Sequence, residues 1–531
     1  MRLIGTVVGV CVIATVASGC SASKPQPNSG KPGGKVVNGG TFTLGMSSDP
    51  GNLDPQASAG TNVFQISQFA YDHLVNEDAK GKIQSGLASA WKVEGATTVF
   101  TLHKGVTCSD GAAFTAADAA ANINYLADPK NKSPFLGVFL PAGSKASADA
   151  AAGTVTMTTP KAAPFVLGGL ANLPIVCAKG LKDRSALARK TDGTGPYQLS
   201  EAASGDHYTY TKRTGYSWGP DGAGTATAGL PSKIVVKIVS NETTATNLLL
   251  SGGLNAAGIL GADVARLEAA HLFSASANAV SGEMWFNQAP GRPTADEPVR
   301  QALTSALDLT TLAKVVTSGR GTTGTTFATV APTPCPGNSI TAVLPAHDLA
   351  KAKQLLDGAG WRAGSGGVRA KGGKDLSVNF VYNTASGASG SAAADLATAT
   401  WKQLGVKVKT TPQDETAINT TLFSTGNWDV IWEALNVNSP DQIVPFVSGA
   451  VPPNGTDFAH VNNAKYTGLV TKASALTGSD SCSDWLQAES ELVKAADVIP
   501  FANQVSKIFG NHARFDLAGV LVPTSIRMLA S

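Results

Sequence analysis

Patterns typical of strands and of helices alternate along this chain, and that alternation restricts its fold more than any other feature. Apolar residues recur at every second position, or in a continuous run, in the segments that predict strands, and with helical spacing in later ones. The strand segments are 41–47, 98–104, 233–239 and 406–408, and the helical ones are 299–307, 347–360 and 391–404. A chain of 531 residues also exceeds what one hydrophobic core usually accommodates. The sequence therefore predicts a mixed α/β protein with at least two domains.

Composition excludes several other classes of protein. Charged residues make up 15% of the chain, against roughly 25% in an average soluble domain, and the net charge is only +3. A nucleic-acid-binding protein would carry a strong basic patch, and a disordered chain would have fewer apolar residues than the 43% found here. We therefore expect a folded protein without a nucleic-acid partner. Its exposed loops or hairpin tips are expected at the Gly/Ser-rich stretches 219–229, 363–374 and 384–391.

The N-terminus predicts export. An uncharged, mostly apolar run from Leu3 to Ala17 follows Arg2, and it is too short to span a bilayer, which takes about 20 residues. Residues 1–19 are therefore expected to be a signal peptide. Cys20 follows in a context that resembles the lipobox of bacterial lipoproteins, although Ala17 stands where Leu is usual. The alternative is ordinary secretion with an unmodified Cys20.

A flexible tether is expected after the lipidation site. Residues 20–40 are dense in Ser, Pro, Gly and Lys and have no apolar periodicity. A lipidated Cys20 on such a tether would hold a globular protein at the outer face of the cell membrane without spanning it. The expected location is thus extracytoplasmic and lipid-anchored.

Four cysteines remain beyond the signal peptide and the lipidation site. An exported chain meets an oxidising environment, so disulfides are expected, with buried free thiols as the alternative. Four cysteines allow three pairings, and no C-x-x-C spacing indicates a zinc site. These residues are Cys108, Cys177, Cys335 and Cys482.

No motif for catalysis stands out in the sequence. The G-x-S-x-G and H-E-x-x-H patterns of hydrolases do not occur, and the seven histidines are scattered. A G-x-G-x-x-G pattern occurs at 319–324, but it follows a helical segment instead of a strand, so it predicts a turn and no dinucleotide site. We therefore expect neither an enzyme nor a cofactor.

Seven segments, in order, resemble the extracytoplasmic solute-binding proteins of ABC importers, family 5, the oligopeptide, dipeptide and nickel class. The most specific runs from Leu87 to Asp118, LASAWKVEGATTVFTLHKGVTCSDGAAFTAAD, in which His103 and Cys108 depart from the usual residues. Within it, Thr115 and Asp118 match a capping box at a helix start. The other matching segments are 45–55, 193–199, 286–308, 350–361, 401–408 and 496–503.

The resemblance implies a periplasmic-binding-protein-like fold of two α/β lobes joined by a hinge. Lobe I would span 41–284, with an extra subdomain at about 60–185, and lobe II would span 285–504. Residues 505–531 would return to lobe I. If each disulfide stays within one lobe, the expected pairs are Cys108–Cys177 and Cys335–Cys482.

The implied function is capture of an oligopeptide or peptide-like solute in the cleft between the lobes and its delivery to the membrane permease. ATP would be used by other subunits, and the binding protein would act as a monomer. Two alternatives remain open on the same scaffold: a binding protein for a non-peptide solute such as a glycan, and a sensor of signalling peptides. Scattered histidines argue against a metal-chelate ligand.

The expected ligand residues centre on the stretch 428–446. Alignment on Pro440 places Asn436 where peptide-binding members carry an Asp that holds the ligand's ammonium group, and a neutral Asn cannot replace that charge. Glu433 could substitute for it, or could be a solvated surface charge. The remaining expected ligand residues are Asn52, Leu53, Asp54, Trp285, Tyr382, Asn383, Trp432 and Asp441.

Overall fold

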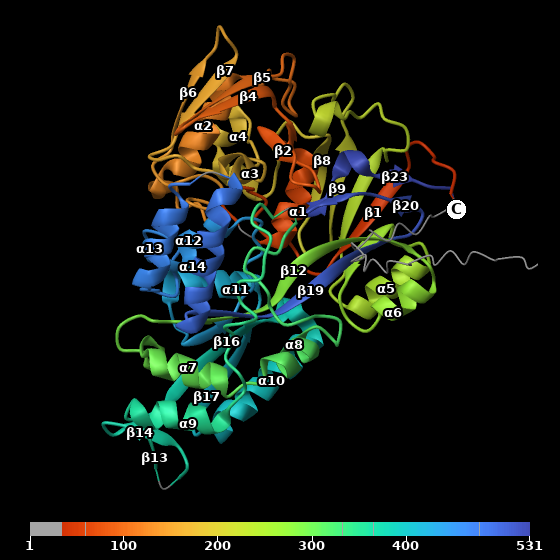
Figure 1. Cartoon of the computed structure of the whole chain (residues 1–531). Coiled ribbons are helices and arrows are strands. Elements are labelled where there is room, and N and C mark those ends of the chain that lie inside the picture. The colour runs from red at the N-terminus through yellow and green to blue at the C-terminus, as the bar shows by residue number, and fades with distance from the viewer. Residues whose placement is uncertain (1–33, 59, 332, 365, 477, 531) are drawn as a thin grey trace, which may run out of the picture.

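A computed structural model describes residues 34–530 of the chain except 59, 332, 365 and 477 (Figure 1). The expected signal peptide, the lipidation site at Cys20 and most of the tether lie outside these residues. Among the described helices, none combines the length and the apolar character needed to cross a membrane.

One ten-stranded sheet runs through the molecule in the order β17-β16-β18-β12-β19-β11-β1-β10-β9-β8. Its two central strands, β12 and β19, separate a group of three strands from a group of five. The three are β16 (Ser377–Asn383), β17 (Lys407–Gln413) and β18 (Val430–Trp432). The five are β1 (Thr41–Met46), β8 (Tyr197–Ala203), β9 (His207–Lys212), β10 (Lys233–Ile238) and β11 (Ala256–Ile259).

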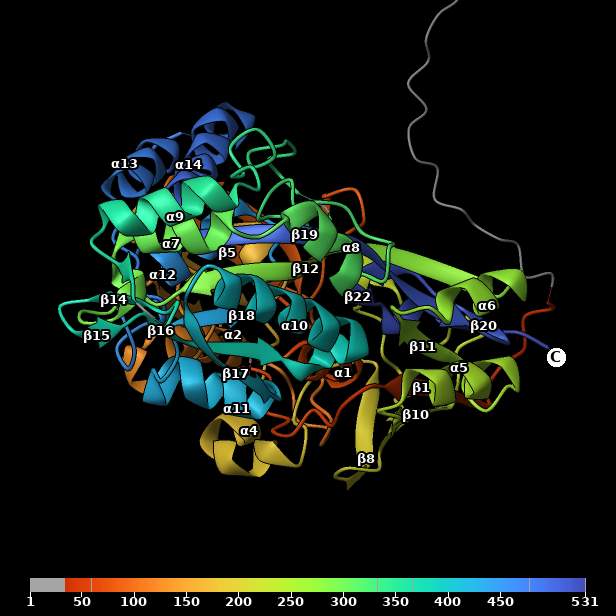
Figure 2. The same ribbon diagram turned by 90° about the horizontal axis from the view of Figure 1, so that it is seen from below.

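The two central strands connect the lobes. β12 (Phe273–Phe286) and β19 (Val498–Gly510) pair antiparallel along almost their whole length. One end of β19 pairs with β11 of lobe I, and the opposite end of β12 pairs with β18 of lobe II. Figures 1 and 2 show both strands passing between the two halves of the molecule. The expected boundaries at 284/285 and 504/505 fall inside these strands, because each strand belongs to both lobes.

Lobe I contains the five-strand group and a subdomain built on a second sheet (Figure 1, orange). That sheet has the order β4-β5-β7-β6 and is covered by α2 (Ala116–Ala127). Its strands are β4 (Ala88–Glu94), β5 (Thr97–Leu102), β6 (Lys145–Asp149) and β7 (Thr154–Thr158). The capping box predicted for α2 is present: the Asp118 N–H donates to the Thr115 hydroxyl, and Asp118 accepts from the Thr115 N–H.

In lobe II, helices cover the sheet around a core that includes Phe380, Trp401 and Leu492 (Figure 2). Trp401 is fully buried, packs edge-on against Phe380 and donates its indole N–H to the Leu303 carbonyl. The helices are α7 (Glu297–Ser305), α8 (Leu309–Val316), α9 (Leu349–Gly358), α10 (Gly387–Gln403), α13 (Ala464–Ala473) and α14 (Cys482–Lys494).

Two local predictions differ from the structure. The stretch 384–391 was expected to be a loop, but α10 begins at Gly387, because its small residues Ala393, Ala394 and Ala397 are buried in the lobe II core and packing outweighs the low helix propensity of Gly and Ser. The continuous apolar run at 233–239 predicts a central strand that is buried on both faces, and this differs from strand β10. Only the face with Ile234 and Val236 is buried.

Both disulfides are present in the structure, Cys108–Cys177 in the subdomain and Cys335–Cys482 in lobe II. The second bridge lies in a small buried cluster with Ala473 and Trp485, and Phe165 of the subdomain packs against that cluster. The two lobes therefore also meet away from β12 and β19.

The G-x-G-x-x-G segment forms a turn that packs on the connecting strand β19, and not a dinucleotide loop. Thr322 and Asn503 exchange two backbone hydrogen bonds of 2.8 Å. A Cβ on Gly321 would lie 2.5 Å from the Asn503 carbonyl oxygen, and one on Gly324 would lie 1.9 Å from the Pro500 carbonyl oxygen. The glycines thus allow the backbone of this turn to approach β19.

Gly324→Ala is expected to lower the free energy of unfolding by about 1–3 kcal/mol, because the added methyl group would overlap backbone that cannot move aside like a flexible side chain. Chemical denaturation measures the change. The control is Gly358→Ala near the end of α9, where nothing lies within 4 Å of the new Cβ. That variant should be neutral or more stable by up to about 1 kcal/mol. Equal effects of the two substitutions would contradict the close approach.

Candidate ligand-binding cleft

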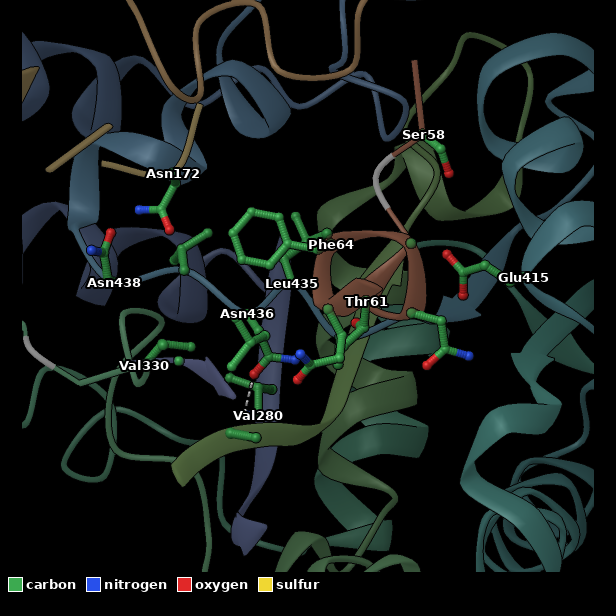
Figure 3. Close-up of a pocket in the computed structure, with 18 of the residues that line it drawn as sticks. Ser58, Thr61, Phe64, Asn172, Val280, Val330, Glu415, Leu435, Asn436 and Asn438 are labelled. Atoms are coloured by element: carbon green, nitrogen blue, oxygen red, sulfur yellow. Dashed lines mark hydrogen bonds between the residues drawn. The ribbon is translucent and has the colours of Figure 1, made fainter. Parts of the chain in front are cut away.

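A cavity of about 3530 Å³ lies between the lobes. Lobe I contributes the loop after β1 and the first turns of α1 (Thr61–Ala70), and lobe II contributes segments 414–426 and 432–442. Figure 3 shows Thr61 and Phe64 of α1 facing Leu435 and Asn436 across this space. Sites for small molecules usually measure about 300–1,000 Å³, so this cavity has room for a larger solute with its water.

The carboxyl ends of three parallel strands open into the cavity. β16 pairs parallel with both β17 and β18, so all three end at the same edge of the sheet. Asn383 ends β16, Glu415 follows β17 as the first residue of α11 (Glu415–Thr420), and Glu433 follows β18. Ligands of open α/β sheets bind beyond the carboxyl ends of the strands. Polar contacts with a ligand are therefore expected at this edge of the sheet.

Asn383 holds two carboxylates side by side at this edge. Its Nδ2 donates to Glu433 Oε2 at 2.9 Å and to Glu415 Oε2 at 3.0 Å, while its Oδ1 accepts from the Ala385 N–H. Burial, Glu415 and Glu283 raise the pKa of Glu433 to about 8, and the Asn383 hydrogen bond opposes that shift. Glu433 is thus no ordinary solvated surface charge.

A third carboxyl group, Glu283, lies on β12 behind this pair. It is 1% exposed, and its Oε2 accepts hydrogen bonds from the Leu435 N–H at 2.8 Å and Trp285 Nε1 at 3.2 Å. Its Oε1 is buried without a hydrogen-bond partner among the described residues. Burial raises the pKa of Glu283 to about 8, with Glu489 adding to the effect. At neutral pH the group is therefore largely protonated.

Glu283→Gln is expected to remove part of the pH dependence of stability. A carboxyl whose pKa rises from 4.5 to about 8 on folding stabilises the fold fully below pH 4.5 and progressively less as pH rises through 8. The amide matches the protonated acid: its oxygen can accept from Leu435 and Trp285, and its NH₂ takes the place of Oε1. Near pH 9 the variant should be more stable than the wild type by on the order of 1–3 kcal/mol, since a buried carboxylate is no longer left unsatisfied.

Denaturation curves at about pH 5 and pH 9 test this expectation, with the two proteins nearly equal at the lower pH. The nearby carboxyl groups of Glu433 and Glu489 interact electrostatically with Glu283. Both are unchanged in the variant, so the comparison isolates the Glu283 carboxyl. A variant that is less stable than the wild type at the higher pH would contradict the assigned state of Glu283.

Asn436, which the sequence resemblance placed where an ammonium-binding Asp was expected, is hydrogen-bonded to the connecting strand. Its Oδ1 accepts from the Val280 N–H of β12 at 2.8 Å (Figure 3, dashed line). The side chain is exposed to the cavity, but the oxygen that could accept from a ligand is already hydrogen-bonded. Asn436 therefore connects the cavity to β12 and offers its amide N–H groups to a ligand.

Seven of the ten ligand residues expected from the sequence line the cavity, and three do not. Leu53 is buried in the lobe I core, and Asp54 forms a buried ion pair with Arg184. Trp285 is fully buried and packs against Phe458, with its N–H donating to the Glu433 carbonyl at 2.9 Å. The seven in the lining are Asn52, Tyr382, Asn383, Trp432, Glu433, Asn436 and Asp441.

Other residues that line the cavity were not among those predicted from the sequence. Glu415 could have been found, because it lies two residues beyond β17, whose start the apolar pattern at 406–408 predicts. Asn438 could not, because its role depends on the other lobe: its Nδ2 donates to Glu77 Oε2 of the subdomain at 3.2 Å. Burial and Asp78 raise the pKa of Glu77 to about 7.

The described lining of the cavity is acidic and contains no arginine. Carboxylates are held in proteins chiefly by arginine, so the lining is poorly suited to an anionic ligand. The acidic residues are Asp49, Asp72, Glu77, Asp78, Glu242, Asp263, Glu283, Asp414, Glu415, Glu433, Asp441 and Asp516, and the basic ones besides histidine are Lys80, Lys132, Lys161 and Lys507.

Comparison with known proteins agrees with this architecture. The family model described as bacterial extracellular solute-binding proteins, family 5, middle region, matches residues 82–453. The chain belongs to this family. The periplasmic murein peptide-binding protein MppA of Escherichia coli, a family 5 relative of the chain, is 26% identical over 491 residues, which cover 85% of each protein.

Solved structures share the family 5 fold. The oligopeptide-binding protein AppA of Bacillus subtilis, in complex with a nonapeptide, superposes with a TM-score of 0.78 at 18% identity, covering 94% of this chain and 100% of AppA. A substrate-binding protein of Microbacterium hydrocarbonoxydans, in complex with 4-hydroxybenzoate hydrazide, gives 0.77 at 24% identity, covering 92% and 99%. One fold thus encloses solutes of very different size.

Proposed function

We propose that this family 5 protein captures a peptide or peptide-like solute between its lobes and delivers it to the permease of an ABC importer. The observation that carries the proposal is the large cavity between two lobes that two paired strands join. A solute that touches both lobes stabilises the closed arrangement, and hinge closure of this kind is a common way to enclose a ligand. The protein would bind and release its solute without changing it.

The proposal includes export and anchoring. A signal peptide cleaved before Cys20 would leave a lipidated cysteine, and the tether would let the protein move between solute and permease as a monomer. Mass spectrometry of the mature N-terminal peptide would detect a diacylglyceryl cysteine. An unmodified Cys20 would instead support plain secretion.

Binding to a mixed panel tests the solute class. Purified mature protein should gain thermal stability from oligopeptides, because a ligand that binds only the folded state raises the unfolding temperature with its concentration. Native mass spectrometry of the purified protein would identify any solute that copurifies. A panel of oligopeptides that gives no stabilisation at millimolar concentration would contradict the peptide assignment.

One observation favours a second candidate, a non-peptide solute such as a glycan. Asn436 lacks the charge of the Asp that anchors a peptide's ammonium group, and its oxygen is bonded to Val280. Oligosaccharides therefore belong in the same panel, and stabilisation by them alone would favour this candidate. A sensor of signalling peptides would bind in the same way and would be separated from an importer by loss of solute uptake when the permease is deleted.

A further inference from the structure

Three carboxyl groups converge on one wall of the cavity without a cation. Glu433 and Glu415 each accept from the same nitrogen, Nδ2 of Asn383, at 2.9 and 3.0 Å, so their Oε2 atoms lie within about 6 Å of each other. None of these groups, nor Glu283 behind them, takes part in an ion pair in the described structure. Like charges this close repel each other unless a cation or a proton intervenes.

A second observation points to a missing partner at the same place. Glu283 is only 1% exposed and lines the cavity. Its Oε1 has no hydrogen-bond partner in the described part of the chain. Buried polar atoms in folded proteins are nearly always hydrogen-bonded, so an unpartnered one on a cavity wall requires an explanation. Glu283 is also a direct neighbour of Glu433, because the Glu433 N–H donates to the Glu283 carbonyl at 3.2 Å.

The pair of carboxylates is held rigidly. Asn383 uses both of its amide hydrogens on Glu433 and Glu415, and its oxygen accepts from Ala385, so its orientation is determined by three hydrogen bonds. On the lobe I side, Glu415 Cγ lies 3.9 Å from the Cβ position of Gly60, at the start of α1. Glu415 therefore lies beside lobe I, so the pair is at a point of the cavity where the two lobes meet.

We propose that this wall is a subsite for a positively charged nitrogen of the solute, an amine or a guanidinium, held between Glu433 and Glu415. The inference rests on the proposed function and names the solute class more narrowly: cationic peptides or peptide-like amines. A cation bound there would favour the ionised form of Glu433, whose pKa is otherwise about 8, and would donate a charge-assisted hydrogen bond to each of the two carboxylates. A metal ion is a poorer occupant, because no three His, Cys, Asp or Glu side chains among the described residues are placed so that they could hold one ion. The scarcity of basic groups in the lining agrees with a cationic solute.

Matched probes that differ only in charge test the subsite. One series uses peptides, N-acetyl-Ala-Lys-Ala amide against N-acetyl-Ala-Gln-Ala amide, and free trialanine against its N-acetylated form. The other uses non-peptides, putrescine against 1,4-butanediol. Isothermal titration calorimetry is run on the wild type, on Glu433→Gln and on Glu94→Gln, an exposed carboxyl of β4 outside the cavity that matches the change in net charge.

The wild type and Glu94→Gln should bind the cationic member of at least one pair at least about tenfold more tightly than the neutral member, which corresponds to about 1.4 kcal/mol. Glu433→Gln should lose that preference. Equal binding, or no binding, of both members in every pair would overturn the subsite, and so would a preference that Glu433→Gln retains. A different result would contradict the peptide assignment alone. In that case putrescine would bind to the wild type and lose its preference in Glu433→Gln, while neither peptide pair would bind.

Discussion

Asp497→Ala is expected to lower the free energy of unfolding by about 3–5 kcal/mol, because it leaves a buried arginine without its counter-ion. Asp497 precedes β19 and is 2% exposed, and its partner Arg300 is 4% exposed. Asp497 Oδ1 accepts from Arg300 Nη2 and Gln288 Nε2, both at 2.9 Å, and Oδ2 accepts from Asn463 Nδ2 at 2.8 Å. One carboxylate thus ties together three separate segments of lobe II where the connecting strand begins.

Asp375→Ala is the matched control, because Asp375 pairs with Lys407 at the surface, with side chains 44% and 56% exposed. Removal of an exposed ion pair should change stability by less than about 1 kcal/mol. Urea denaturation of both variants gives the comparison. If Asp497→Ala costs no more than Asp375→Ala, the arginine has found other compensation, such as the carbonyl groups of Ala495 and Ala496 that it already contacts.

Local apolar patterns predicted a helix or strand correctly where the segment's own sequence determines its secondary structure. The alternating segment 41–47 is strand β1, and the helical stripe in 347–360 is α9, which ends at Gly358 as the glycines there suggested. The start of α10 at Gly387 was missed, because its helical state depends on burial against a core that no local window contains.

The connection between the lobes was beyond such patterns. It arises from the pairing of β12 with β19, whose paired residues are more than 200 positions apart in the sequence. Chain length predicted at least two domains, but only the ordered resemblance to family 5 predicted two lobes joined by a hinge. Residues 82–453 match the family model and carry most of that information.

In the candidate site, too, residues fixed by local sequence were predicted correctly, and residues fixed by distant contacts were not. Asn383 and Glu433 were found because each ends a recognisable strand, and both face the cavity. Asp54 was misplaced because its partner, Arg184, lies 130 residues away, and a sequence cannot show that this ion pair turns the carboxylate away from the cleft. Trp285 was misplaced because its indole packs into the lobe II core, and Glu283, two residues earlier on the same strand, is the residue that lines the cavity.

Replacing both Cys335 and Cys482 with serine is expected to lower the free energy of unfolding by up to about 5 kcal/mol. The bridge closes a loop with a sequence separation of 147 residues, and a cross-link that closes a long loop removes more conformational freedom from the unfolded chain. The bridge also supports the cluster of Ala473 and Trp485 on which Phe165 of the subdomain packs. Its loss should therefore loosen a contact between the lobes as well as lobe II itself.

The double variant Cys108→Ser/Cys177→Ser provides the comparison, because its bridge has a sequence separation of 69 and should contribute about 0.7 kcal/mol less by loop length alone. Both variants are measured by guanidinium denaturation, with solute binding recorded by calorimetry. If the Cys335–Cys482 bridge positions the surface that meets Phe165, its removal should weaken solute binding, whereas removal of Cys108–Cys177 should act on the stability of the subdomain. A cost below about 1 kcal/mol for both double variants would mean that packing, and not the cross-links, holds these loops in place.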